Sequence, residues 1–229
     1  RLGLKLANVI ADIRGESLCS ALLVAMAGAL ILGMGMPTPA AYAVAAAVLG
    51  PPLGRLGIEM LPGHLFIYYF ACLAAITPPV AIAAFAAASI TRVEPMRTGL
   101  AAVRVGIVMF TIPFVFAWYP ELLLIEEAVT ITDDMGRRAL IEGYTGEVDW
   151  AALSVLGARL VLALYLTASA LALYDFGPLR RWEAGLRLLA AVLVLWKTAP
   201  LVWVGLGLAV LLIVGHALVN RAAAARAAV

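Results

Sequence analysis

The sequence predicts an all-α integral membrane protein, and three observations carry this prediction. Hydrophobic residues make up 65% of the 229-residue chain and charged residues 13%, whereas a soluble domain is nearer half apolar and a quarter charged. The mean hydropathy is +1.04. A transmembrane helix needs about 20 apolar residues, and the chain has five long stretches without Asp, Glu, Lys or Arg. These are residues 17–54, 60–91, 105–120, 160–174 and 198–220.

Composition also excludes some classes of protein. The net charge of +2 provides no polybasic surface, so no nucleic-acid partner is expected. Cys19 and Cys72 lie far apart in apolar runs, which predicts buried, inert thiols rather than a disulfide or metal framework. The chain begins at Arg1 and shows no signal peptide, so we expect a fragment of a longer membrane protein whose missing length the sequence does not give.

Residues 1–16 alternate charged and apolar side chains, which predicts an amphipathic connecting helix. An apolar segment follows at 17–32. The segment Gly33–Pro39 (GMGMPTP) then interrupts it before a helix resumes at 40–50. Neither piece alone comfortably spans about 30 Å at about 1.5 Å per residue. Two glycines and two prolines in one short segment favour a re-entrant hairpin over a single kinked helix.

A second interruption follows soon after the first. We expect a surface link from Pro51 to Gly63 and a short apolar helix at 63–75. The sequence Ile76-Thr77-Pro78-Pro79 breaks this helix, and residues 80–91 continue it. Together the two pieces are long enough to cross the bilayer, which predicts a discontinuous transmembrane helix. With the hairpin it forms one region at 17–97.

About four transmembrane helices are expected after this region. Residues 98–125 form the first of them, which has interfacial aromatics at Trp118 and Tyr119. Residues 126–150 form an acidic external loop, since the stretch 119–150 holds eight acids and two bases. Residues 151–229 hold the C-terminal helices, at about 151–174, 184–197 and 200–219.

The distribution of basic residues predicts an orientation, because Lys and Arg gather on the cytoplasmic side of a membrane protein. The basic clusters that we place inside are Arg92/Arg97, Arg180/Arg181/Arg187 and Arg221/Arg226. The acidic loop then lies outside, and the hairpin of 17–50 opens toward the outside with its tip in the membrane. The basic residues before residue 56 also fall outside, which strains the rule.

The two breaks are the strongest functional signal in the sequence. An unpaired backbone amide or carbonyl in hydrocarbon costs several kcal/mol, so protein, water or a ligand must satisfy it. Carbonyls at helix C-terminal ends suit a cation and amides at N-terminal ends suit an anion. Paired breaks of this kind point to the substrate and ion site of a transporter. The alternative is that both are kinks that neighbouring helices repair.

The residue types fit such a site. Glycine allows close backbone approach, proline frees a carbonyl one turn earlier, and Thr38 and Thr77 supply hydroxyls. Neither break contains a charged side chain, which is compatible with Na⁺ held by neutral oxygens. We therefore expect Na⁺ as coupling ion, no other cofactor, and Gly33, Thr38 and Thr77 as candidate Na⁺ ligands. The candidate ion and substrate site comprises Gly33, Gly35, Met36, Pro37, Thr38, Thr77, Pro78 and Pro79.

These residues resemble a known family. Gly33–Leu49 and His64–Ile90, with ITPPV at 76–80, look like the C-terminal half of the large membrane subunit of TRAP transporters. The GMGMPT form is most similar to the fused-permease branch that works with TAXI-type binding proteins. The resemblance covers about residues 1–125. Residues 126–229 resemble, more weakly, the extra C-terminal helices of some fused permeases.

The resemblance implies an elevator-type transporter of two inverted repeats, of which this chain holds the second. It implies Na⁺-driven import of an organic acid, often a carboxylate, across the cytoplasmic (inner) membrane of a bacterium or archaeon. The implied partners are a TAXI-type periplasmic binding protein and the rest of the permease, with its first repeat and small-subunit region. By resemblance, Gly33, Gly35, Thr38, Thr77 and Pro78 line the site. The substrate, stoichiometry and oligomeric state stay open.

Each of the other polar residues has a structural interpretation beside a functional one. His64 is interpreted as an interfacial histidine rather than a gate, and His216 as a packing or snorkelling group. Arg104 could anchor a carboxylate or snorkel, and for Arg159 and Arg187 snorkelling is favoured. A non-catalytic scaffold whose breaks are structural is the alternative function. No enzyme is expected, because the apolar runs contain no nucleophile–base pair and no paired carboxylates.

Overall fold

The computed structural model describes residues 18–124, 129–132, 138–141 and 149–227. The chain divides into two compact units, Arg1–Val148 and Asp149–Val229. Within the described residues, three helical segments are long and apolar enough to cross a membrane: Pro95–Trp118, Trp150–Ala172 and Ala199–Leu218. The all-α membrane fold is therefore confirmed. The amphipathic helix expected at 1–16 lies outside the described residues.

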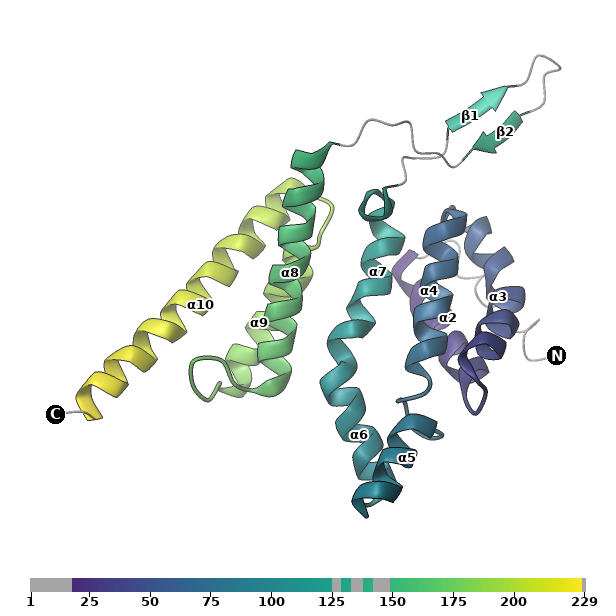
Figure 1. The fold of residues 1–229 in the computed structure, drawn as a ribbon. Coiled ribbons are helices and arrows are strands. Elements are labelled where there is room, and N and C mark those ends of the chain that lie inside the picture. The colour runs from purple at the N-terminus through teal and green to yellow at the C-terminus, as the bar shows by residue number, and fades with distance from the viewer. Residues whose placement is uncertain (1–17, 125–128, 133–137, 142–148, 228–229) are drawn as a thin grey trace. The chain divides into compact units, whose positions relative to one another are not determined.

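The predicted hairpin is present as two helices joined by a short turn (Figure 1). Helix α2 (Leu18–Gly33) and helix α3 (Thr38–Arg55) pack against each other and against helix α4 (Met60–Leu73). The helices meet in a hydrophobic core that includes Leu22, Leu49, Leu53, Phe66 and Phe70. Cys19 lies on the exposed side of α2, so the expected burial of this thiol is wrong, and Cys72 is half-buried.

The surface link expected at Pro51–Gly63 is wrong at both ends. Helix α3 continues through Pro51 and Pro52 to Arg55, and α4 begins at Met60. Proline normally ends a helix because it lacks an amide and crowds the preceding turn. Here Pro52 is buried and Leu53 is only 1% exposed, so packing against the core holds the last turn in place.

The predicted discontinuous helix is also present. Helix α4 ends at Leu73, residues 74–81 form turns, and helix α5 (Ile82–Thr91) follows and packs against helix α6 (Pro95–Gly106). A 3₁₀ turn, η2 (Ile107–Phe110), joins α6 to helix α7 (Thr111–Trp118). The Phe114 ring of α7 packs edge-on against Phe66 and Phe70 of α4, at centroid distances of 5.4 and 5.9 Å.

A two-stranded hairpin lies within the stretch predicted as an acidic loop, and it is the one departure from helix in the described residues beyond turns. After the 3₁₀ turn η3 (Pro120–Leu123), strand β1 (Val129–Thr132) pairs antiparallel with strand β2 (Arg138–Ile141). The sequence of β1, VTIT, consists of β-branched residues, which favour the extended backbone. The remainder of this stretch lies outside the described residues.

The second unit contains three helices. Helix α8 (Trp150–Ala172) is capped by the Asp149 side chain, which accepts hydrogen bonds from the amides of Ala151 and Ala152 at 3.0 Å. Helix α9 (Arg181–Val194) packs against both α8 and helix α10 (Ala199–Ala227). With 14 residues, α9 reaches only about 21 Å. It has the length of the short helix that we expected at 184–197 and begins three residues earlier.

Candidate ion and substrate site at two adjacent helix breaks

The first break brings two opposite helix ends to one turn. Helix α2 ends at Gly33, and the backbone reverses through Gly35, whose φ is +78°. Glycine adopts this left-handed conformation without a steric penalty. Helix α3 then begins at Thr38, directly after Pro37, and Pro39 occupies its first turn, where no amide bond is lost. Carbonyls of α2 and amides of α3 therefore end at the same tip.

The second break also joins a helix C-terminus to a helix N-terminus. The chain leaves α4 in a series of turns and enters α5 through Ala81, which has a positive φ of 30°. Two backbone hydrogen bonds cross the break, from the Ala81 amide to the Thr77 carbonyl at 3.2 Å and from the Ala83 amide to the Ala75 carbonyl at 2.9 Å. The break is therefore an ordered structure and not a frayed helix end.

Glycine contacts place the two breaks side by side. A Cβ added to Gly33 would lie 2.9 Å from the Cβ of Ala74 and 3.4 Å from the Ala71 carbonyl oxygen. A Cβ added to Gly35 would lie 3.8 Å from a methyl group of Val80. The hairpin tip thus packs directly on the end of α4 and on the turns after it, and a larger side chain at 33 would separate them.

Several backbone carbonyls at the two breaks keep their lone pairs free. Among the described residues, no backbone amide donates to the carbonyls of Gly35 and Met36 in the first break, or to those of Ile76 and Val80 in the second. In a membrane such carbonyls need a partner. A desolvated cation is one partner that several carbonyls can share, so the breaks can bind one.

The two candidate hydroxyls behave differently. Thr77 is half-buried, and its hydroxyl donates to the Leu73 carbonyl at 2.7 Å. Its single hydrogen is therefore used inside the break, and its oxygen can only accept from a further partner or ligate a cation. Thr38 is half-buried in the first turn of α3. Among the described residues, no hydrogen bond joins the two hydroxyls.

The other candidate residues differ in how far they are exposed. Gly33 is buried, Met36 and Pro78 are half-buried, and the exposed ones are Gly35, Pro37 and Pro79. The contacts therefore bring Gly33 and Gly35 against the second break, while Pro37 and Pro79 face outward from this unit. Within the described residues, no group of three or more His, Cys, Asp or Glu side chains could hold a metal ion.

Sequence reasoning missed the support behind the second break. A Cβ added to Gly99 would lie 3.0 Å from Cγ of Pro78, and one added to Gly106 would lie 3.0 Å from Cδ1 of Ile76. Both glycines belong to α6, so this helix packs closely on the break. Their spacing of seven residues puts them on one helix face, and that spacing was the available signal.

The remaining polar residues have structural partners. His64 Nδ1 lies 2.8 Å from the Tyr42 hydroxyl, which links α4 to α3. Arg104 is exposed at the end of α6. Arg159 donates to the carbonyls of Val194 and Trp196 at 2.9 Å, so it caps the end of α9 rather than snorkelling.

Snorkelling of Arg187 is wrong. Its side chain is 0% exposed, its Nη1 donates to Ser169 at 2.7 Å, and its Nη2 lies 2.7 Å from Asp175 Oδ2. The second contact is a buried ion pair. The partner carboxylate lies in the turn before α9, which folds back onto the helix.

Comparison with known proteins identifies the first unit. Residues 1–131 match the family model of the tripartite ATP-independent periplasmic transporter, DctM component. No curated protein and no solved structure matches the chain. The match spans more than half of the chain and contains both helix breaks. The chain therefore belongs to the DctM family and is a membrane permease component of a tripartite ATP-independent periplasmic (TRAP) transporter.

Proposed function

We propose that the two adjacent breaks form a Na⁺ and substrate site for import of an organic acid, in the class of carboxylates, across the cytoplasmic membrane of a bacterium or archaeon. A periplasmic binding protein of the TAXI type would deliver the substrate. The rest of the permease, with its first repeat and small-subunit region, would complete the transporter. The contact of the hairpin tip with the second break, at Gly33 and Ala74, is the single observation that carries this proposal.

The helix ends supply both signs of partial charge at this place. The C-terminal ends of α2 and α4 carry partial negative charge, and the N-terminal ends of α3 and α5 carry partial positive charge. Carbonyl ends suit Na⁺, and amide ends suit the carboxylate of a substrate. Because the breaks contain no ionised side chain, binding of the anion depends on these dipoles and on the bound cation. Na⁺ and substrate would therefore bind cooperatively.

Thr77 is the side chain best placed to act as a Na⁺ ligand. Its hydroxyl hydrogen is directed to Leu73, which leaves the oxygen lone pairs toward the break. Replacement by valine keeps the volume and shape of the side chain and removes this oxygen. We expect Thr77→Val to abolish Na⁺-coupled uptake by the assembled transporter while leaving its expression unchanged.

Thr167→Val provides a matched control. Thr167 is also half-buried in a helix and donates to the carbonyl four residues earlier, at 2.8 Å from Ala163. It lies in the second unit and belongs to neither break. Uptake should survive this substitution. Normal uptake by Thr77→Val would remove Thr77 from the site and would favour the scaffold alternative, in which the breaks serve packing alone.

A further inference from the structure

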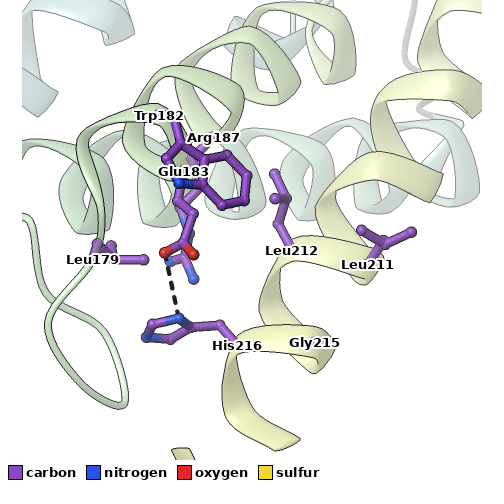
Figure 2. A pocket seen from close by; sticks show the side chains of 8 residues that line it. All are labelled: Leu179, Trp182, Glu183, Arg187, Leu211, Leu212, Gly215 and His216. Atoms are coloured by element: carbon purple, nitrogen blue, oxygen red, sulfur yellow. Dashed lines mark ion pairs between the residues drawn. The ribbon is translucent and has the colours of Figure 1, made fainter. Parts of the chain in front are cut away.

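A pocket of about 170 Å³ lies between α9 and α10 in the second unit, outside the residues that match the DctM family. Figure 2 shows Trp182, Glu183 and Arg187 on the side of α9, with Leu212 and His216 of α10 pointing toward them. The walls are mostly aliphatic and aromatic, and they include Leu179, Trp182, Leu211 and Leu212. The polar groups that line it are Glu183, Arg187 and His216.

Two nitrogens of the Arg187 guanidinium, Nε and Nη2, make no hydrogen bond among the described residues. Its Nη1 donates to Ser169 and its Nη2 pairs with Asp175, so the positive charge is balanced. Among the described residues, its Nε has no hydrogen-bond partner although the side chain is fully buried. A buried donor without a partner costs about 1–3 kcal/mol. Nε is closed off from the pocket, and the charge of Arg187 already has its counter-ion, so this residue adds no unbalanced charge to the pocket wall.

The acidic group in the pocket is also engaged. Glu183 Oε2 lies 3.6 Å from His216 Nδ1 and accepts a hydrogen bond from the Arg180 amide at 3.3 Å. With a carboxylate already present, a free anion would be disfavoured inside the pocket. Both constraints point to an uncharged, apolar group inside the pocket.

The rim of the pocket lies at the end of a candidate membrane span. Helix α8 is a candidate membrane span that ends at Ala172, so the turn after it, where α9 begins, lies at the end of a span. Arg180, Arg181 and Trp182 are exposed there. Tryptophan and arginine at this level are typical of contact with lipid headgroups, and the amide end of α9 adds partial positive charge.

We propose that this pocket binds a phospholipid. The methylenes next to the lipid's ester fill the apolar part of the pocket between Leu179 and Leu212. The phosphate lies outside, against Arg180 and Arg181. A volume of about 170 Å³ equals roughly five or six water molecules, which accommodates the ester region and leaves the remaining acyl chain along the exposed side of α10.

Two glycines of α10 allow a sharp test. A Cβ at Gly215, which lines the pocket, and a Cβ at Gly207, which does not, would each meet no atom within 4 Å. Gly215→Leu should therefore fill the pocket without disturbing the helix, and Gly207→Leu is its matched control. The probe is phosphatidylglycerol added to the full chain in detergent after delipidation, with bound lipid counted by native mass spectrometry.

We expect Gly215→Leu to bind phosphatidylglycerol roughly tenfold to a hundredfold more weakly, the loss that corresponds to two or three buried methylenes. Gly207→Leu should bind like the parent chain. Circular dichroism and gel filtration should be unchanged in both. Equal binding by all three chains, or no binding by the parent chain, would overturn the proposal.

A second pair of measurements keeps the test valid if Gly215→Leu does not fold. Arg180→Gln with Arg181→Gln alters exposed side chains only. It should weaken binding of phosphatidylglycerol and leave binding of diacylglycerol, which lacks the phosphate, unchanged. Inorganic phosphate should not compete with either lipid. Competition by inorganic phosphate would show an anion site instead of a lipid site and would contradict the proposal.

Discussion

The two units handle polar groups inside a membrane in opposite ways. The first interrupts its helices and leaves backbone carbonyls without a donor at Gly35, Met36, Ile76 and Val80, with no ionised side chain in either break. The second keeps α8, α9 and α10 free of breaks and buries a full ionic charge, Arg187, against Asp175. Partial charges at the breaks have no complete partner within the described residues, whereas the buried ion pair in the second unit is neutralised internally.

This difference distinguishes a ligand-binding site from a structural ion pair. A backbone break that remains incompletely satisfied can bind a ligand and release it again. The Asp175–Arg187 pair fixes the turn before α9 onto the helix and has no charge left for a ligand. Changes to the ion pair should therefore affect stability most, and changes at the breaks should affect transport more than stability.

The largest effect is expected at the ion pair. Asp175→Asn removes the counter-ion of a guanidinium that is 0% exposed. Breaking a buried pair from one side typically costs about 3–5 kcal/mol, and we expect a loss of this size in the free energy of unfolding. Thermal or chemical unfolding of the chain in detergent measures it.

The double substitution Asp175→Leu with Arg187→Met is the matched control for that change. Because it removes both charges, it should restore most of the stability. If the double variant were as unstable as Asp175→Asn, the charge balance would not be the reason for the loss, and the contrast between the two units would fail.

A smaller effect is expected at the contact between the breaks. Gly33→Ala places a Cβ 2.9 Å from the Cβ of Ala74, and overpacking of this kind costs about 1–3 kcal/mol. We expect a matching loss of stability together with a loss of uptake, since the hairpin tip must move away from α4. Uptake by the assembled transporter and unfolding of the chain measure the two losses.

Two further variants sharpen this prediction. Ala74→Gly added to Gly33→Ala relieves the clash and should restore part of both properties. Gly54→Ala in α3, where a Cβ meets nothing within 4 Å, should be neutral or stabilise by up to about 1 kcal/mol. An unchanged transporter with Gly33→Ala would show that the two breaks are not in close contact.

The smallest effect is expected between α3 and α4. Tyr42→Phe removes the hydroxyl that lies 2.8 Å from His64 Nδ1 and leaves the ring contacts in place. A partly buried hydrogen bond contributes about 1 kcal/mol. We expect a loss of this size in the free energy of unfolding, with uptake retained. A loss of uptake without loss of stability would instead place His64 in gating.

Much of the first unit could be predicted because its signal is local. Proline at 37, 39, 78 and 79 restricts the backbone, and glycine at 33 and 35 permits conformations closed to other residues, so one sequence was enough to predict both breaks. The same reasoning was wrong at Pro51 and Pro52, where burial of Leu53 in the core overrides the tendency of proline to end a helix. The core that holds this turn is formed by other helices, which local propensity does not include.

The second unit was harder to predict because its main feature is not local. Asp175 and Arg187 are separated by a turn and two helical turns, and their pairing depends on how the chain folds back between α8 and α9. The close contacts of Gly99 and Gly106 were missed for the same reason, since a glycine face on a helix does not identify what packs against it. When a charged residue lies in an apolar helix, an ion-pair partner in a nearby turn should be considered before snorkelling is inferred.

Labelling of single cysteines at Thr38 and Thr77 tests the central claim, that the two breaks form one ion site, most directly. The background is the assembled transporter with Cys19 and Cys72 replaced by alanine, and Thr91→Cys, which is exposed at the end of α5, is the control. Each cysteine at a break is combined with the native threonine at the other, so that a Na⁺ ligand remains. At ten times its dissociation constant, Na⁺ should slow labelling by about elevenfold at both breaks and leave position 91 unchanged. Equal labelling rates with and without Na⁺ and substrate at positions 38 and 77 would contradict the account.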